Sequence, residues 1–253
     1  MGTQHKKRDG FTIIEVVLFL AISGALAVGI LASSSIAINN QRYRDSLNSL
    51  QSLLQQQYNQ TSNVINQYTS RDKLCDTNGI ATKEVGQGAA RGTSQCLIMG
   101  RYVAISNGQA IKLSNVIGFG ETTGDAANDM EELRKYKFFV SESEMESNEV
   151  AWGGTINVKS PDGQSFTQPN QIFVILILRS PLTGAIRTVS YNTNAAGALD
   201  INNQAVLVSD NLHERDLCLD PGAFMVGTKL GVAIRENTAN SSGIEILQDD
   251  NKC

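Results

Sequence analysis

Residues Phe11–Ile38 read FTIIEVVLFLAISGALAVGILASSSIAI, an almost unbroken apolar run in which Glu15 is the one formal charge. A helix of this length would extend about 42 Å at ~1.5 Å per residue, which is enough to cross a bilayer. The next charge along the chain is Arg42, and the basic stretch Lys6–Arg8 precedes the run. Basic residues favour the cytoplasmic side of a membrane. The sequence therefore predicts a single-pass segment with its N-terminus in the cytoplasm and the rest of the chain outside.

The apolar run continues directly into an amphipathic pattern. Apolar and aromatic residues, with one threonine, recur at spacings of three and four: Tyr43, Leu47, Leu50, Leu54, Tyr58, Thr61, Ile65 and Tyr68. Such spacing places them on one face of a helix. The residues between them include many Gln and Asn and no proline. We therefore predict one long helix over residues 11–70, membrane-soluble over 11–38 and amphipathic over 39–70.

The rest of the chain, residues 71–253, has the pattern of short strands separated by turns. Asn107-Gly108 between two apolar runs is a strong hairpin signal. Ile172–Leu178 is apolar at every position, which is typical of a central strand, and Pro181–Gly184 is suited to the turn that follows. Other predicted elements are strands at Leu97–Ile105, Ala110–Ile117, Tyr136–Val140, Thr155–Val158, Ala185–Tyr191, Ala205–Val208, Leu230–Arg235 and Ile244–Leu247, and a short helix starting near Asp125 or Asn128. The predicted fold class is α+β, a long helix followed by a β-rich globular head.

Charge and cysteine content limit the classes of function. The net charge of the 253-residue chain is −4; the first ten residues contribute +2, which leaves −6 for the remainder, so no general nucleic-acid binding is predicted. The four cysteines include no C-x-x-C pair, and an even number fits disulfides in an oxidising compartment. Among the three possible pairings we favour Cys75–Cys96 with Cys218–Cys253, because each pair brackets a Gly- and Asn-rich segment. Four reduced, buried thiols are the alternative.

No catalytic constellation is visible in the sequence. His213 is the one histidine beyond the first ten residues, and His213–Asp216 lacks the second histidine of a zinc-protease motif, because Leu217 stands in its place. We interpret His213–Asp216 as a surface turn before Cys218. The acidic run over residues 142–149 is interpreted as a solvated face, with calcium binding as the alternative. The sequence thus predicts no enzyme, no metal site and no cofactor.

The junction between the basic start and the apolar run carries the most specific motif, made by Lys6, Lys7, Arg8, Gly10, Phe11 and Glu15. It closely resembles the leader and cleavage site of type IV pilins and type II secretion pseudopilins. The resemblance implies that a prepilin peptidase removes residues 1–10 after Gly10 and that Phe11 becomes N-methylated. It also implies an assembly charge pair between Glu15 and the Phe11 amine of a neighbouring subunit. Asp9, between the basic residues and the glycine, departs from the family's pattern.

Physical chemistry gives Glu15 a similar significance. A carboxylate within hydrocarbon costs several kcal/mol unless it is paired or neutralised, so an isolated Glu there indicates a function. One alternative is a plain membrane anchor in which Glu15 reaches the membrane edge. Another is an ordinary secretory signal peptide cleaved near Ala25–Ala27, which would leave Glu15 without a role.

The resemblance also sets expectations for the head and for function. It implies an antiparallel sheet packed on the amphipathic half of the helix; the large size of the head leaves open two sheets or one sheet with long loops. Residues 218–253 resemble the disulfide-bounded C-terminal loop of pilins. The expected function is a major or minor pilus subunit that is held in the inner membrane before it joins other pilin subunits in an extracellular filament. The alternatives are a secretion pseudopilin and a monomeric, membrane-anchored binding protein.

Overall fold

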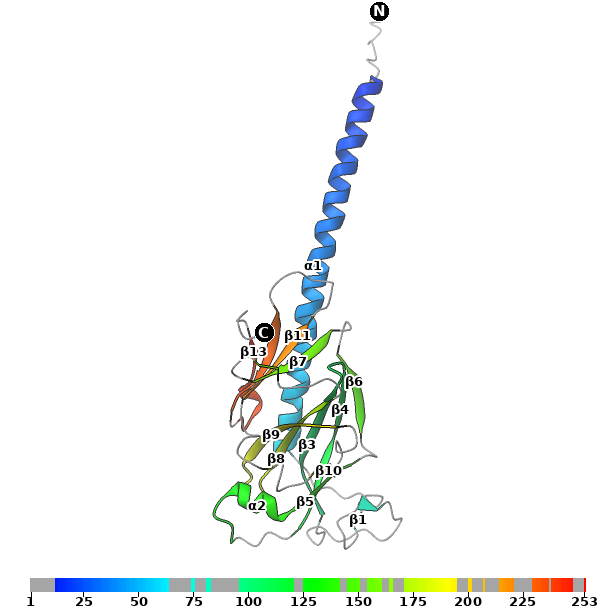
Figure 1. Cartoon of the computed structure of the whole chain (residues 1–253). Coiled ribbons are helices and arrows are strands. Elements are labelled where there is room, and N and C mark those ends of the chain that lie inside the picture. Colours follow the sequence, from blue (N-terminus) through cyan, green and yellow to red (C-terminus); the bar gives the residue numbers. More distant parts are fainter. Residues whose placement is uncertain are drawn as a thin grey trace, which may run out of the picture. The chain divides into compact units, whose positions relative to one another are not determined.

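A computed structural model describes residues 12–63, 74–75, 81–82, 96–120, 125–141, 145–150, 154–160, 164–165, 171–194, 200–201, 207, 214–220, 229–236, 238–247 and 253. The chain divides into two compact units, Met1–Arg42 and Tyr43–Cys253. Helix α1 (Ile13–Ser62) contributes residues to both units, as the blue to cyan ribbon of Figure 1 shows. The unit boundary falls where the sequence changes from continuously apolar to amphipathic.

The second unit contains two main antiparallel sheets (Figure 1). The larger has the order β10-β5-β4-β3-β8-β9, with β6 also paired to β4, and the smaller has the order β13-β12-β11-β7. The strands of the larger sheet are β3 (Cys96–Ser106), β4 (Ala110–Phe119), β5 (Lys137–Val140), β6 (Glu146–Glu149), β8 (Ile172–Arg179), β9 (Ile186–Thr193) and β10 (Asp200–Ile201). Those of the smaller are β7 (Thr155–Lys159), β11 (Arg215–Asp220), β12 (Leu230–Ile234) and β13 (Ile244–Leu247). A separate pair joins β1 (Leu74–Cys75) and β2 (Ala81–Thr82), and the short helices are α2 (Asp129–Lys135) and η5 (Ser241–Gly243).

The predicted stripe of α1 lies at the centre of the main hydrophobic core. Tyr43, Leu47, Leu50, Leu54, Tyr58 and Thr61 are all buried, as predicted. The first five form one apolar cluster with inward-facing residues of both sheets. The α+β fold class, with a long helix packed against antiparallel sheet, is therefore confirmed, and the head has two main sheets. The architecture is pilin-like in this respect.

A second core covers the opposite face of the larger sheet. Along β8, Phe173, Ile175 and Ile177 belong to the cluster around α1, whereas Val174 and Leu176 belong to a cluster that includes residues of α2. Alternate side chains of a strand point to opposite faces, so a strand between two cores must be apolar throughout. This explains why β8 lies inside the sheet, as predicted.

The Asn107-Gly108 hairpin connects the two sheets. Asn107 has φ 52° and Gly108 has φ 66°, and both are in the left-handed region; they are the central residues of a turn closed by the hydrogen bond from Gln109 N to Ser106 O at 3.1 Å. Gly108 O accepts a hydrogen bond from Ile156 N at 2.7 Å, which ties the turn of the larger sheet to β7 of the smaller. A Cβ at Gly108 would lie 2.6 Å from Ile156 O. The glycine is therefore required both by its backbone conformation and by this close approach.

The described part of helix α1 covers the predicted helix only as far as Ser62. It stops at Ser62, with Asn63 in a turn, whereas the stripe was extended to Tyr68; Ile65 and Tyr68 lie outside the described residues. Thr61 Oγ1 donates to Gln57 O at 2.9 Å and Ser62 Oγ donates to Tyr58 O at 3.0 Å. Hydroxyls that bond back to the preceding turn compete with the helical backbone and favour helix ends.

The segment interpreted as a surface turn before Cys218 is instead a buried strand. Arg215 and Asp216 begin β11 and are buried, although His213 itself is not among the described residues. In β11, Leu217 and Leu219 face the core around α1, and Cys218 alternates with them. The charges of Arg215, Asp216 and Asp220 leave no alternating apolar pattern from which this strand could be predicted. One strand prediction also differs, because Leu207, within the predicted strand Ala205–Val208, lies in a bend. In the acidic run interpreted as a solvated face, residues Glu146–Glu149 form strand β6, and most of their side chains are exposed.

Candidate functional site

The start of α1 contains a reciprocal hydrogen-bond arrangement around Glu15. Thr12 N donates to Glu15 Oε2 at 3.0 Å, Thr12 Oγ1 donates to the same oxygen at 3.1 Å, and Glu15 N donates to Thr12 Oγ1 at 3.3 Å. This is a capping box, in which each residue satisfies an orphan donor of the first helical turn. The T-x-x-E spacing was readable from the sequence. Glu15 thus has a local structural role in addition to the assembly role expected from the resemblance.

The other residues of the predicted processing site lie outside the described part of the chain. These are Lys6, Lys7, Arg8, Gly10 and Phe11. Cleavage after Gly10, methylation of Phe11 and the charge pair with Glu15 therefore stay predictions.

The first half of α1 exposes apolar side chains in every direction. The exposed large residues are Ile13, Ile14, Val16, Val17, Leu18, Phe19, Leu20, Ile22, Leu26, Val28, Ile30, Leu31, Ile36 and Ile38. A helix that is apolar all round normally lies in a protein core or in a membrane. By its length and composition α1 is sufficient to cross a bilayer, although an N-terminal signal sequence has the same properties.

In the second unit, Tyr43 joins α1 to the smaller sheet through its hydroxyl. Tyr43 Oη donates to Leu219 O at 2.7 Å and accepts from Leu230 N at 2.7 Å. Leu219 and Leu230 are paired residues of β11 and β12, so the hydroxyl bridges the two strands. Burial raises the pKa of the Tyr43 phenol above its ordinary value, so the hydroxyl keeps its proton at neutral pH.

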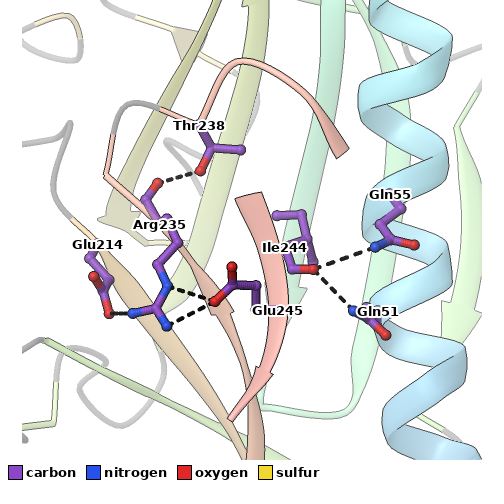
Figure 2. A network of polar contacts seen from close by, with 7 residues as sticks. All are labelled: Gln51, Gln55, Glu214, Arg235, Thr238, Ile244 and Glu245. Atoms are coloured by element: carbon purple, nitrogen blue, oxygen red, sulfur yellow. Dashed lines mark hydrogen bonds and ion pairs between the residues drawn. The ribbon is translucent and has the colours of Figure 1, made fainter. Parts of the chain in front are cut away.

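Glutamines of α1 bind the edge of the same sheet. Gln51 Nε2 donates to Ile244 O at 3.0 Å, and Gln55 Nε2 approaches the same oxygen at 3.4 Å. Figure 2 shows both side chains reaching from the helix to the start of β13. Two helical amides therefore satisfy a carbonyl of the edge strand.

An ion-pair cluster ties β13 to the rest of its sheet. Figure 2 shows Arg235 between two carboxylates: Nη1 lies 2.7 Å from Glu214 Oε1, and Nη2 lies 2.9 Å from Glu245 Oε2. The hydrogen bonds that Arg235 donates to the Glu245 carboxylate are the main cause of a raised pKa for Arg235. Thr238 Oγ1 donates to the backbone carbonyl of Arg235, which holds the turn after β12.

A chain of partly buried hydrogen bonds connects α1 to β9 and to the turn after β12. Tyr58 Oη lies 2.7 Å from Thr188 Oγ1 in β9, and Thr188 Oγ1 donates to Thr238 O at 2.9 Å. Because the Thr188 proton is directed to Thr238, the Tyr58 hydroxyl is the donor in the first contact. Together with Tyr43, Gln51 and Gln55, these contacts fix the register of the helix against the head. No sequence signal identified their partners, which lie more than a hundred residues away.

A disulfide closes the smaller sheet. Cys218 of β11 is bonded to Cys253, which is one of the pairings that the sequence analysis favoured. Lys159 Nζ of β7 also donates to Cys253 O at 2.9 Å. The segment between the cysteines was compared with a loop, but it contains β12, η5 and β13. The side chains of Cys75 and Cys96 lie outside the described part of the chain, so their pairing stays a prediction.

Among the residues whose placement is described, no group of three His, Cys, Asp or Glu side chains is arranged to hold a metal ion. No protein-family model matches the chain, and neither a curated protein nor a solved structure matches it. The pilin-like architecture therefore rests on the helix, its exposed apolar half and the antiparallel head.

Proposed function

We propose that this chain is a structural subunit of a type IV pilus, cleaved after Gly10, N-methylated at Phe11 and assembled through the first half of α1. The observation that carries the proposal is the set of exposed large apolar side chains along residues 13–38, with Glu15 as the one charge of that segment. Lipid would cover this surface before assembly, and equivalent helices of other subunits would cover it afterwards. The role is structural rather than catalytic.

The capping box makes it possible to separate two roles of Glu15. A glutamine at this position of a capping box also accepts the backbone hydrogen bond, so Glu15→Gln retains the helix start while it removes the negative charge. Glu15→Ala removes both. If the charge pairs with the Phe11 amine of a neighbour, both variants should be processed normally and should enter filaments poorly.

The decisive experiment compares these variants in purified surface filaments by quantitative mass spectrometry of the subunits. Thr12→Ala is the matched control, because it weakens the cap and leaves the charge. We expect Thr12→Ala to assemble close to wild-type levels and Glu15→Gln to be depleted by at least about tenfold, which corresponds to roughly 1.4 kcal/mol. Wild-type incorporation of Glu15→Gln would show that the charge has no part in assembly.

Processing is tested independently by N-terminal sequencing of the membrane-associated protein. We expect a methylated Phe11 at the mature N-terminus, and we expect Gly10→Val to accumulate as precursor because a branched side chain would stand beside the scissile bond. A mature protein that retains Lys6–Arg8 would contradict the proposal.

A pseudopilin of a type II secretion system is the second candidate, favoured by the two-sheet head. If the chain is a pseudopilin, purified surface filaments should not contain it, and deletion of its gene should abolish secretion of an exported enzyme. A monomeric, membrane-anchored binding protein would give neither result.

A further inference from the structure

A groove of about 440 Å³ lies in the second unit, between the last turns of α1 and the strands β3 and β4. Its volume is within the range of small-molecule sites, roughly 300–1,000 Å³. Four carboxamide side chains form its helical wall: Gln56, Asn59, Gln60 and Asn63. Their spacing of three and four residues places them on one face of α1.

The amides of α1 fall into two groups with different environments. The first group stabilises the fold. Gln51 and Gln55 both donate to Ile244 O, and Gln57 donates to Leu53 O. The side chains of the four groove amides are exposed, and they form no hydrogen bond with any part of the chain that the structure describes. Toward the described part of the chain, the wall therefore presents donors and acceptors without a hydrogen-bond partner.

The opposite side of the groove is held in place by a buried arginine. Arg101 of β3 is only 8% exposed, and its Nε donates to Gln57 Oε1 at 2.8 Å. Its Nη1 donates to Asn115 Oδ1 of β4 at 2.6 Å. Ile98 supplies an apolar contact in the same lining. One side of the groove is thus fixed by the hydrogen bonds of Arg101, and the other is a wall of amides whose side chains have no partner among the described residues.

We propose that this groove binds a neutral carbohydrate. A carboxamide offers a donor and an acceptor side by side, and each sugar hydroxyl is likewise both. The lining residues include no carboxylate to hold a cation, and a single guanidinium is a weak basis for binding a polyanion. The aliphatic face of a sugar ring would lie against Ile98. This site does not depend on filament assembly and is separate from the proposed structural function.

The full-length chain is solubilised in a detergent whose headgroup contains no sugar. The solubilised protein is then applied to an array of neutral, sialylated and sulfated oligosaccharides. Hits are titrated with the soluble oligosaccharide by isothermal calorimetry. The double variant Asn59→Ala/Gln60→Ala removes two groove amides, and we expect about a tenfold or greater loss of affinity from two hydrogen bonds. Asn48→Ala is the matched control, because this exposed amide lies three turns earlier on α1, outside the groove.

The proposal is supported if a neutral oligosaccharide binds, the double variant loses binding and Asn48→Ala retains it. It is overturned if no neutral oligosaccharide binds, as would happen if the chain itself filled the groove, or if the double variant binds as well as wild type. Binding restricted to sialylated or sulfated glycans would also overturn it. Glu15→Ala should bind sugar normally, so failure of the assembly proposal would not be mistaken for failure of this one.

Discussion

Replacing Tyr43 with phenylalanine tests whether the helix is fixed to the smaller sheet by its hydroxyl. The substitution keeps the ring, which is 5% exposed within the main core, and removes one oxygen. That oxygen accepts from Leu230 N and donates to Leu219 O, each at 2.7 Å. Tyr43→Phe therefore removes two hydrogen bonds at once and separates the ends of β11 and β12 from α1.

The expected cost follows from those two bonds. Each typical hydrogen bond contributes about 0.5–1.5 kcal/mol net, so the loss should lower the free energy of unfolding by about 1–3 kcal/mol. For a unit of this size, each kcal/mol lost from the free energy of unfolding lowers the melting temperature by about 2–4 °C. A loss near 2 kcal/mol should therefore lower the melting temperature by roughly 4–8 °C. Thermal unfolding of the full chain in detergent, followed by near-ultraviolet circular dichroism, measures this shift.

Tyr58→Phe is the matched control on the same helix. Tyr58 is also buried, but its hydroxyl has one partner, Thr188 Oγ1, which keeps its own bond to Thr238 O. The control should lose about 0.5–1.5 kcal/mol, roughly half the effect at Tyr43. A Tyr43→Phe variant as stable as wild type, or less affected than Tyr58→Phe, would refute the bridging role of the Tyr43 hydroxyl.

Three further measurements test the head. Cys218 and Cys253 are separated by 35 residues, so in the chain-entropy model the double substitution to serine should lower the free energy of unfolding by about 4 kcal/mol. Urea unfolding measures this change, and a loss below about 1 kcal/mol would contradict a stabilising disulfide. Replacing Leu54, which is 1% exposed, with alanine should lower the free energy of unfolding by about 2–5 kcal/mol. An equal loss for the exposed Ser52→Ala would argue against the buried stripe. Hydrogen bonds from Ser180 and Thr183 lower the pKa of Asp129 below that of an ordinary aspartate. Its contribution to stability is therefore present above the ordinary pKa and is lost as the pH falls through the lower folded pKa; melts between about pH 6 and pH 2 should show this loss in wild type and not in Asp129→Asn.

Elements with a strong local pattern could be predicted from the sequence. The buried stripe of α1, the hairpin at Asn107-Gly108 and the central strand β8 each have their own periodicity or turn chemistry. The start of α2 was predicted for the same reason, since Asn128 Oδ1 accepts from Glu131 N as an N-cap.

What could not be predicted depends on contacts between distant residues. Strand β11 combines charged and apolar residues, and only pairing with β7 and β12 explains the burial of Asp216. The partners of Tyr43 lie 176 and 187 residues along the chain. The glutamines and asparagines of α1 look alike in the sequence, yet some bind the head and others line a groove. Their roles are set by the sheets beside them, which no local pattern specifies.

The change of pattern near Arg42 has a physical consequence for α1. Beyond that residue, one face of the helix is apolar and is buried by the two sheets, so the fold itself supplies the stabilising contacts. Before it, large apolar side chains are exposed on every side, from Ile13 at 86% to Ile38 at 48%. Fully burying one such side chain contributes about 1.5–3 kcal/mol, so this half of the helix has a strong drive to leave water. Lipid and other apolar helices both meet that requirement, and they are nearly equivalent as apolar surroundings. Apolar burial alone therefore contributes little preference for filament over membrane. In the proposed filament a buried charge would contribute one, because lipid offers Glu15 no cation whereas the Phe11 amine of a neighbouring subunit would.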